Sequence, residues 1–349
     1  MESILSRAFV GKRASFKAKP VARSQEDLIR TSYLSSGGPT PLVIMPAVEL
    51  IDLSDWIAGN LTYLDEKLLL HGGILFRGFD LHTQEDFQKV LDATKVELIN
   101  YSESSTPRKQ LGSHVYTSTE FPPDQVIALH NELSTAATFP LKIWFFALQP
   151  PQQGGETPIA DVRNVYKRLS KAVQEEFASR GWMVVRNYND GFGPTWQEAF
   201  HTADKSEVED YCRRNAITLE WKDHDRLRTW QVRPAITTHV KTGEVLWFNH
   251  MAFWHISSLN PAVRESLLRE FAEQDLPFHT YYGDGGRIEA AVIDEVRAAY
   301  RDETISFPWE KGDLLMLDNM LIAHGRNSYT GPRRILVGMG EPYTRTDLS

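Results

Sequence analysis

The chain contains 349 residues, with 38 Lys and Arg against 46 Asp and Glu, and its formal net charge is −8. With 42% hydrophobic and 24% charged residues, this is an ordinary globular composition that excludes a disordered, collagen-like or low-complexity chain. The only cysteine, Cys212, excludes an internal disulfide and a cysteine-based zinc or iron–sulfur site, and it favours a reducing compartment. The acidic balance argues against a nucleic-acid partner, and no apolar run approaches the length of a membrane span. We therefore expect a cytoplasmic protein without nucleic-acid or membrane partners, and the composition carries no signal for its oligomeric state.

The first 40 residues differ from the rest. Residues 1–23 carry six basic side chains and one acidic side chain, Glu2, and several serines lie among them. A solvated basic arm, possible disorder included, is the simpler interpretation, and a targeting segment is the alternative. The Ser-Ser-Gly-Gly-Pro stretch at 35–39 predicts a break. We expect an arm over 1–40 and a single domain over 41–349.

Short strands dominate the predicted elements. Residues 48–70 have helix-like apolar spacing, and residues 74–79 follow as a strand. Further strand candidates cover residues 126–129, 141–148, 182–186, 217–221, 227–232, 245–248, 314–317 and 334–339. Helices are predicted at 162–179, 205–215 and 287–301. The pattern predicts a mainly β fold with flanking helices, an antiparallel barrel or jelly roll, with an insertion at about 250–310 that resembles a lid.

A possible metal site begins in the sequence His130-Asn131-Glu132, which follows an apolar strand. Residues two apart on an extended backbone point to the same face, so His130 and Glu132 project together. His324 lies at the end of another apolar run, far enough along the chain to return beside them. Two histidines and one carboxylate on one face, with coordination positions left open, suit non-haem Fe(II) oxygen chemistry.

Two further residues could bind a carboxylate near this group. Arg334 falls on the strand after His324, and an inward arginine can hold a carboxylate by two parallel hydrogen bonds. Thr157 follows Gly154-Gly155, where two glycines permit close approach of the backbone, and its hydroxyl can donate a hydrogen bond.

Together these motifs resemble the taurine dioxygenase-like Fe(II)/2-oxoglutarate oxygenases, and within them the clavaminate synthase and syringomycin aspartyl-hydroxylase branch. The supporting segments are 128–134, 154–161, 247–249, 281–285 and 309–326, with the arginines at 333–334. The resemblance implies a double-stranded β-helix (jelly roll) with His130, Glu132 and His324 as catalytic iron ligands. It also implies that Arg334 binds the distal carboxylate of 2-oxoglutarate, assisted by Thr157, and that O2 is consumed as 2-oxoglutarate becomes succinate and CO2.

The resemblance also narrows the substrate. Members of this branch act on amino acids, free or tethered to a carrier protein, often in specialised metabolite biosynthesis. We expect oxidation of an unactivated C–H bond of such a small molecule, by hydroxylation as the default, with desaturation or cyclisation such as aziridine formation left open. Gly338 stands where taurine dioxygenases carry a sulfonate-binding arginine, and Glu132 keeps the ligand that halogenating relatives lose. Arg186 and Asn249, at strand ends, are candidates for contacting the substrate.

Two other classes of protein fit parts of the pattern. A metal-dependent hydrolase could use the same ligands with zinc, and a jelly-roll binding module could have no catalytic activity. A hydrolase has no need for a co-substrate clamp such as Arg334, and a binding module has no need for three metal ligands. Both features therefore favour the oxygenase.

Overall fold

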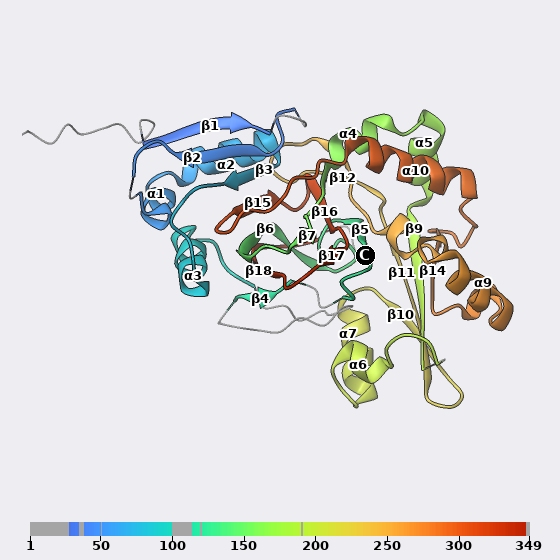
Figure 1. Ribbon diagram of the computed structural model, residues 1–349. Helices are drawn as coiled ribbons and strands as arrows, with labels where there is room; N and C mark the ends of the chain where they lie inside the picture. Colours follow the sequence, from blue (N-terminus) through green and yellow to red (C-terminus); the bar gives the residue numbers. More distant parts are fainter. Residues whose placement is uncertain are drawn as a thin grey trace, which may run out of the picture.

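The computed structural model describes residues 28–34, 38–49, 51–99, 114–118, 121–189 and 191–346. Figure 1 shows a central group of strands with helices α1, α2 and α3 on one side and a second, long-stranded sheet on the other. Residues 1–27, which hold the basic part of the expected arm, lie outside the described residues. In the rest of that segment, residues Ile29–Tyr33 form β1, the first strand of the main sheet, so the expected boundary at residue 40 is too late.

The main sheet has seven strands in the order β1-β2-β3-β15-β6-β18-β4. Neighbouring strands are antiparallel except for the parallel pair of β2 and β3. The strands after β1 are β2 (Leu42–Pro46), β3 (Gly73–Phe76), β15 (Leu314–Asp318), β6 (Thr138–Gln149), β18 (Arg334–Thr344) and β4 (Tyr116–Thr117).

Both faces of this sheet are covered. Side chains alternate along each strand, so neighbouring residues pack on opposite faces. On β6, Trp144 and Phe146 pack with the helices α1 (Leu53–Gly59), α2 (Leu61–His71) and α3 (Gln84–Ala93). Ile143 and Phe145 point to the opposite face and join the larger core cluster. The aromatic run 144–146 therefore serves mainly as core, as a strand buried on both faces requires.

A smaller three-stranded sheet, in the order β5-β16-β8, adds its side chains to the same larger core cluster. Its strands are β5 (Ile127–His130), β16 (Ile322–Arg326) and β8 (Ile159–Asp161), and all pairs are antiparallel. The short strands β7 (Gln153–Gly154) and β17 (Tyr329–Thr330) pair beside it. Two segments far apart in sequence, β5 and β16, thus become neighbours.

The remaining strands form a separate sheet, β10-β11-β9-β14, and a two-stranded ribbon, β12–β13. Their bounds are β9 (Trp182–Tyr188), β10 (Thr218–Lys222), β11 (Arg226–Arg233), β12 (Ile236–Thr238), β13 (Val245–Trp247) and β14 (Phe278–Tyr282). Strand β14 lies inside the expected insertion at 250–310 and is paired along its length with β9. The insertion is therefore built into a sheet at this point.

The remaining helices are α4 (Val162–Arg168), α5 (Lys171–Arg180), α6 (Trp196–Phe200), α7 (Lys205–Arg214), α8 (Met251–Trp254), α9 (Pro261–Glu270) and α10 (Ala290–Glu303). Two predicted helices are each split in two. The predicted helix at 162–179 breaks at Leu169, which is extended, and Ser170 accepts a hydrogen bond from the Val173 amide to start the next helix. The predicted helix at 48–70 breaks at Asn60. Within the described ranges, no helix has the length and apolar character needed to cross a bilayer.

Candidate active site

The expected metal ligands lie together at the ends of β5 and β16. His130 ends β5, Glu132 follows it, and His324 lies in β16 directly opposite His130 in the antiparallel register. Opposed residues on such a pair have neighbouring side chains, and the two imidazole centroids are 4.6 Å apart. One nitrogen from each histidine and one Glu132 oxygen all lie within 4.8 Å of one another.

The Nε2 atoms of His130 and His324 both face the Glu132 carboxylate. The His130 Nδ1–H donates to the Ala128 carbonyl at 2.8 Å, which keeps Nε2 as the lone-pair nitrogen. Glu132 Oε2 lies 3.9 Å from His130 Nε2 and 3.6 Å from His324 Nε2. The Glu132 side chain is only 5% exposed, and a buried carboxylate that faces two imidazoles fits a divalent cation between them.

Arg333, and not Arg334, reaches this group, which corrects the sequence-based assignment. Arg334 is exposed, whereas Arg333 lines the same small hollow as His130 and His324. Val337 of β18 also lines the hollow. Side chains alternate between the two faces of a strand, so Arg333, four residues before Val337, points to the same side as Val337. Its Nε–H donates to the Gly155 carbonyl at 2.9 Å, and its Nη1–H donates to Ser118 Oγ at 3.1 Å.

Arg333 is a poorly compensated cation. Burial, assisted by the nearby Arg326, lowers the pKa of Arg333 to about 10, so the guanidinium is still charged at neutral pH. Among the described residues, no carboxylate lies within ion-pair distance of it. Arg326 is held differently, since its guanidinium donates to the carbonyls of Phe121, Pro122 and Gln125 at 2.8, 2.6 and 2.7 Å.

Thr157 lies where the sequence places it. Its side chain is buried and lines the hollow with Arg333 and His324. The two glycines before it are required by close backbone contact, because a Cβ on Gly154 would lie 2.2 Å from the Ser328 carbonyl oxygen and both glycines have positive φ. The remaining residues that line the hollow are Ser118, Ile127, Phe145, Gly325 and Arg326.

The two expected substrate residues have different surroundings. Asn249 is buried, and its amide serves the backbone: Nδ2–H donates to the Ala235 carbonyl and Oδ1 accepts from the Met251 amide. Both ends of this side chain thus hold the local backbone, and contact of Asn249 with substrate stays a prediction. Arg186 is half-buried between the rings of Tyr188 and Trp254, at 4.8 and 5.0 Å from their centroids.

A wall beside the metal group was not anticipated from the sequence. Phe253 of α8 lies 5.3 Å from the His130 ring, and His250, at the start of α8, lies at the same distance. His250 Nδ1 is 2.5 Å from Ser134 Oγ, and burial lowers the pKa of His250 to about 3, so this ring is neutral. A short helix that folds back onto β5 leaves no periodic signal in sequence.

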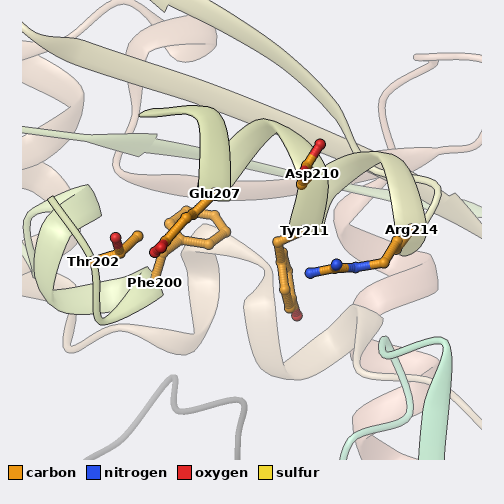
Figure 2. Close-up of a pocket in the computed structure, with 6 residues that line it drawn as sticks. All are labelled: Phe200, Thr202, Glu207, Asp210, Tyr211 and Arg214. Atoms are coloured by element: carbon orange, nitrogen blue, oxygen red, sulfur yellow. The ribbon is translucent and has the colours of Figure 1, made fainter. Parts of the chain in front are cut away.

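A wider hollow of about 350 Å³ lies elsewhere, against α6 and α7. Figure 2 shows its lining residues, Phe200, Thr202, Glu207, Asp210, Tyr211 and Arg214, none of which belongs to the metal group. Its mixture of carboxylates, an arginine and aromatic rings is common on a solvated helix face. The chemistry-bearing residues converge on the smaller hollow, which is therefore the candidate active site.

The chain is similar to known proteins. The family described as "Taurine catabolism dioxygenase TauD, TfdA family" matches residues 39–339. The chain belongs to this family. A relative from Enterobacter agglomerans, dapdiamide synthesis protein DdaC, is 40% identical over 309 residues, covering 88% of this chain and 93% of the relative. A clavaminate synthase-like protein of Arabidopsis thaliana is 29% identical over 312 residues, covering 86% and 91%.

Solved structures share the fold. PvcB, described as an Fe, alpha-ketoglutarate dependent oxygenase from an isonitrile synthetic pathway, has a TM-score of 0.53 at 15% identity, covering 93% of this chain and 95% of PvcB. AAD-2, solved with Mn(II) and N-oxalylglycine, has a TM-score of 0.53 at 15% identity, covering 91% and 99%. The protein is therefore an Fe(II)/2-oxoglutarate-dependent oxygenase by family, which excludes the hydrolase and the non-catalytic binding module.

Proposed function

We propose that His130, Glu132 and His324 hold the Fe(II) of this oxygenase. The observation that carries the proposal is the convergence of one ligand atom from each of these residues, with His130 and His324 lining the same hollow as Thr157 and the buried cation Arg333. Bound iron would supply activation of O2, with 2-oxoglutarate converted to succinate and CO2 while a substrate C–H bond is oxidised. The Ala128 carbonyl fixes the His130 ring, and Glu132 provides the negative charge.

Arg333 is proposed to bind the distal carboxylate of 2-oxoglutarate. Its guanidinium is held in place by Gly155 and Ser118, and among the described residues no carboxylate neutralises its charge. Thr157 lines the same hollow, where its hydroxyl can donate a hydrogen bond to the same carboxylate. The position four residues further on is Val337, which lines the hollow and is apolar. Gly338 faces α3, where a Cβ would lie 2.7 Å from Leu91 Cδ1. Neither position offers a cation for a sulfonate substrate.

We also propose that the main sheet and the sheet β5-β16-β8 form the two halves of a double-stranded β-helix. Residues of both sheets share one core cluster: Ile143 and Leu315 come from the main sheet, and Ile159 and Ile322 come from the smaller one. The TM-scores with solved oxygenases support this architecture. In such a fold the metal group lies between the two layers, at the ends of β5 and β16.

We propose an amino acid or amino-acid derivative as the substrate, oxidised in the biosynthesis of a specialised metabolite. The similarity to a dapdiamide synthesis protein supports this class. Hydroxylation is the default outcome, and desaturation, cyclisation and carrier-tethered presentation fit the same site. A cytoplasmic location stays a prediction.

Arg186 is proposed to bind an anionic group of this substrate. Among the described residues it has no carboxylate partner, and two aromatic rings hold its guanidinium. One of these rings, Trp254, packs against Phe253, which packs against His130. A substrate that lies along this aromatic wall could place its carboxylate on Arg186 and its carbon chain toward the metal group.

The experiment combines turnover with product masses. Purified protein, Fe(II), 2-oxoglutarate and O2 are incubated with individual amino acids, and succinate and products are measured by mass spectrometry. We expect at least one amino acid to stimulate succinate release and to gain an oxygen atom or lose two hydrogen atoms. Absence of succinate under all conditions would overturn the proposed use of this site.

Arg186 is tested with the substrate found in that experiment. Arg186→Gln should raise its KM by tenfold or more, while succinate release without substrate stays as in the wild type. The matched control is Arg228→Gln. Arg228 is also half-buried in this sheet, but it is paired with Asn187 and therefore lies on the opposite face from Arg186. Equal effects of the two variants would exclude a substrate role for Arg186.

A further inference from the structure

Asn319 joins the two halves of the metal group. It lies in the turn between β15 and β16, the strand that carries His324, and it is fully buried. Its Oδ1 accepts a hydrogen bond from the Glu132 amide at 2.7 Å. Its Nδ2 donates to the Glu132 carbonyl at 2.9 Å and to the Pro140 carbonyl at 2.8 Å. One side chain thus holds both backbone polar groups of a proposed metal ligand.

The contact is reciprocal. Asn131, which lies between the ligands His130 and Glu132, donates from Nδ2 to the Asn319 carbonyl at 2.7 Å. The Asn319 amide donates in turn to the Leu141 carbonyl at 2.9 Å. The segment 130–132 and the turn at Asn319 are therefore locked together by side chains from both sides, in an interior where each lost hydrogen bond leaves a buried polar group.

The turn itself is fixed by hydrogen bonds to the buried carboxylate of Asp318. Asp318 Oδ1 accepts from the Met320 and Leu321 amides at 2.9 and 3.0 Å, and Asp318 Oδ2 lies 3.1 Å from His239 Nε2. The Lys241 and Thr242 amides donate to His239 Nδ1, so the ring proton is on Nε2 and is donated to Asp318. Asn319 is thus held on a rigid base.

We propose that Asn319 is a positioning residue for metal binding: it sets the place of Glu132 relative to His324. Strand pairing already aligns His130 with His324, because these residues are opposed in the β5–β16 register. Glu132 lies beyond the end of β5 and has no such pairing, so its backbone is placed by Asn319. The inference rests on the proposed metal site, which it extends to a residue that touches neither metal nor substrate.

The test compares two buried asparagines with similar hydrogen bonds. Asn319→Asp keeps the acceptor for the Glu132 amide and removes both Nδ2 donors. Asn187, in β9 of the other sheet, is the matched control: it is buried, and its Nδ2 donates to two backbone carbonyls, those of Gln274 and Leu276. Co(II) affinity is measured by its visible absorption, together with the melting temperature of each metal-free protein, for the wild type and both variants.

We expect Asn319→Asp to weaken Co(II) binding by about ten- to a hundredfold, which is typical for loss of a residue that orients a ligand. Asn187→Asp should lower the melting temperature while leaving Co(II) affinity within about twofold of the wild type. Wild-type affinity in Asn319→Asp, or equal weakening in both variants, would overturn the inference. A wild-type protein that does not bind Co(II) would overturn the proposed metal site itself.

Asn131→Ala is the second variant in case Asn319→Asp does not fold. It removes only the hydrogen bond to the Asn319 carbonyl and should weaken Co(II) binding in the same direction by a smaller factor. His130→Ala serves as the reference for loss of a direct ligand. If Asn131→Ala binds Co(II) as the wild type does, the interlock has no role in metal binding.

Discussion

At the scale of single residues, the three proposed ligands carry the clearest expectation. His130→Ala, Glu132→Ala and His324→Ala should each reduce succinate release to background, because removal of one of three ligands costs most of the metal affinity. The metal-free variants should remain folded, and Glu132→Ala should melt closest to the wild type because it removes a buried charge. Succinate release and differential scanning fluorimetry check both statements. Normal turnover in any one variant would remove that residue from the site.

The arginine pair gives a second prediction at this scale. Arg333→Ala should raise the KM for 2-oxoglutarate far more than the KM for substrate, since loss of one partner of a buried charge pair costs on the order of 2–5 kcal/mol. At about 1.4 kcal/mol per tenfold, this is a factor of more than ten. Arg334→Ala is the control and should leave both constants within about twofold, because its side chain is exposed. The reverse result would restore the assignment of Arg334.

The adjacent arginines also mark the limit of what sequence could predict. The period of two along a strand was enough to pair His130 with Glu132, since the pattern lies within one short segment. It could not choose between Arg333 and Arg334, because β18 is buried on both faces and shows no alternation from which to read the inward parity. The choice depends on which face of β18 lies toward the metal group, and this is set by tertiary packing.

At the scale of elements, the insertion at 250–310 combines fixed and adjustable parts. Strand β14 was not predicted, because its partner β9 is distant in sequence and a short strand between helices has a weak local signal. Tyr282 is 1% exposed and packs against Phe177, so the glycine-containing turn after β14 starts from a fixed strand. The lid-like insertion is thus anchored at this turn, whereas α8, in the same insertion, contacts the site.

This arrangement predicts where substrate binding changes dynamics. Hydrogen exchange should slow in 251–258, which hold α8 and the following turn, because Phe253 closes on one side of the metal group. Residues 278–282 should be protected equally with and without substrate, since five register pairs join β14 to β9. The measurement uses the metal-loaded protein with 2-oxoglutarate under anaerobic conditions. Substrate-dependent protection confined to 278–290 would show that the lid lies there and not in α8.

At the scale of the whole molecule, buried histidines predict how stability depends on pH. Burial lowers the pKa of His255 to about 3 and of His279 to about 4, and their rings lie 4.6 Å apart in the insertion. The charged groups that act on them are Arg264, Arg297, Glu273 and Arg287. In the unfolded chain both histidines titrate near 6.5. Between these values the unfolded state binds more protons, so stability is full above about pH 6.5 and falls as the pH is lowered.

The expected size is about 1 kcal/mol per histidine between pH 7.5 and 5.5, after allowance for their partial exposure. Carboxylates with lowered pKa, such as Asp52 and Asp86, stay ionised in both states over this range and contribute little to the change. His279→Asn, whose amide oxygen can accept from the Ile256 amide as His279 Nδ1 does, should reduce the acid-induced loss by about 1 kcal/mol. Urea unfolding at the two pH values measures it. The control His224→Asn, at an exposed position with left-handed φ that asparagine tolerates, should leave the difference unchanged, and an equal effect of both variants would contradict the assignment of the acid response to the buried pair.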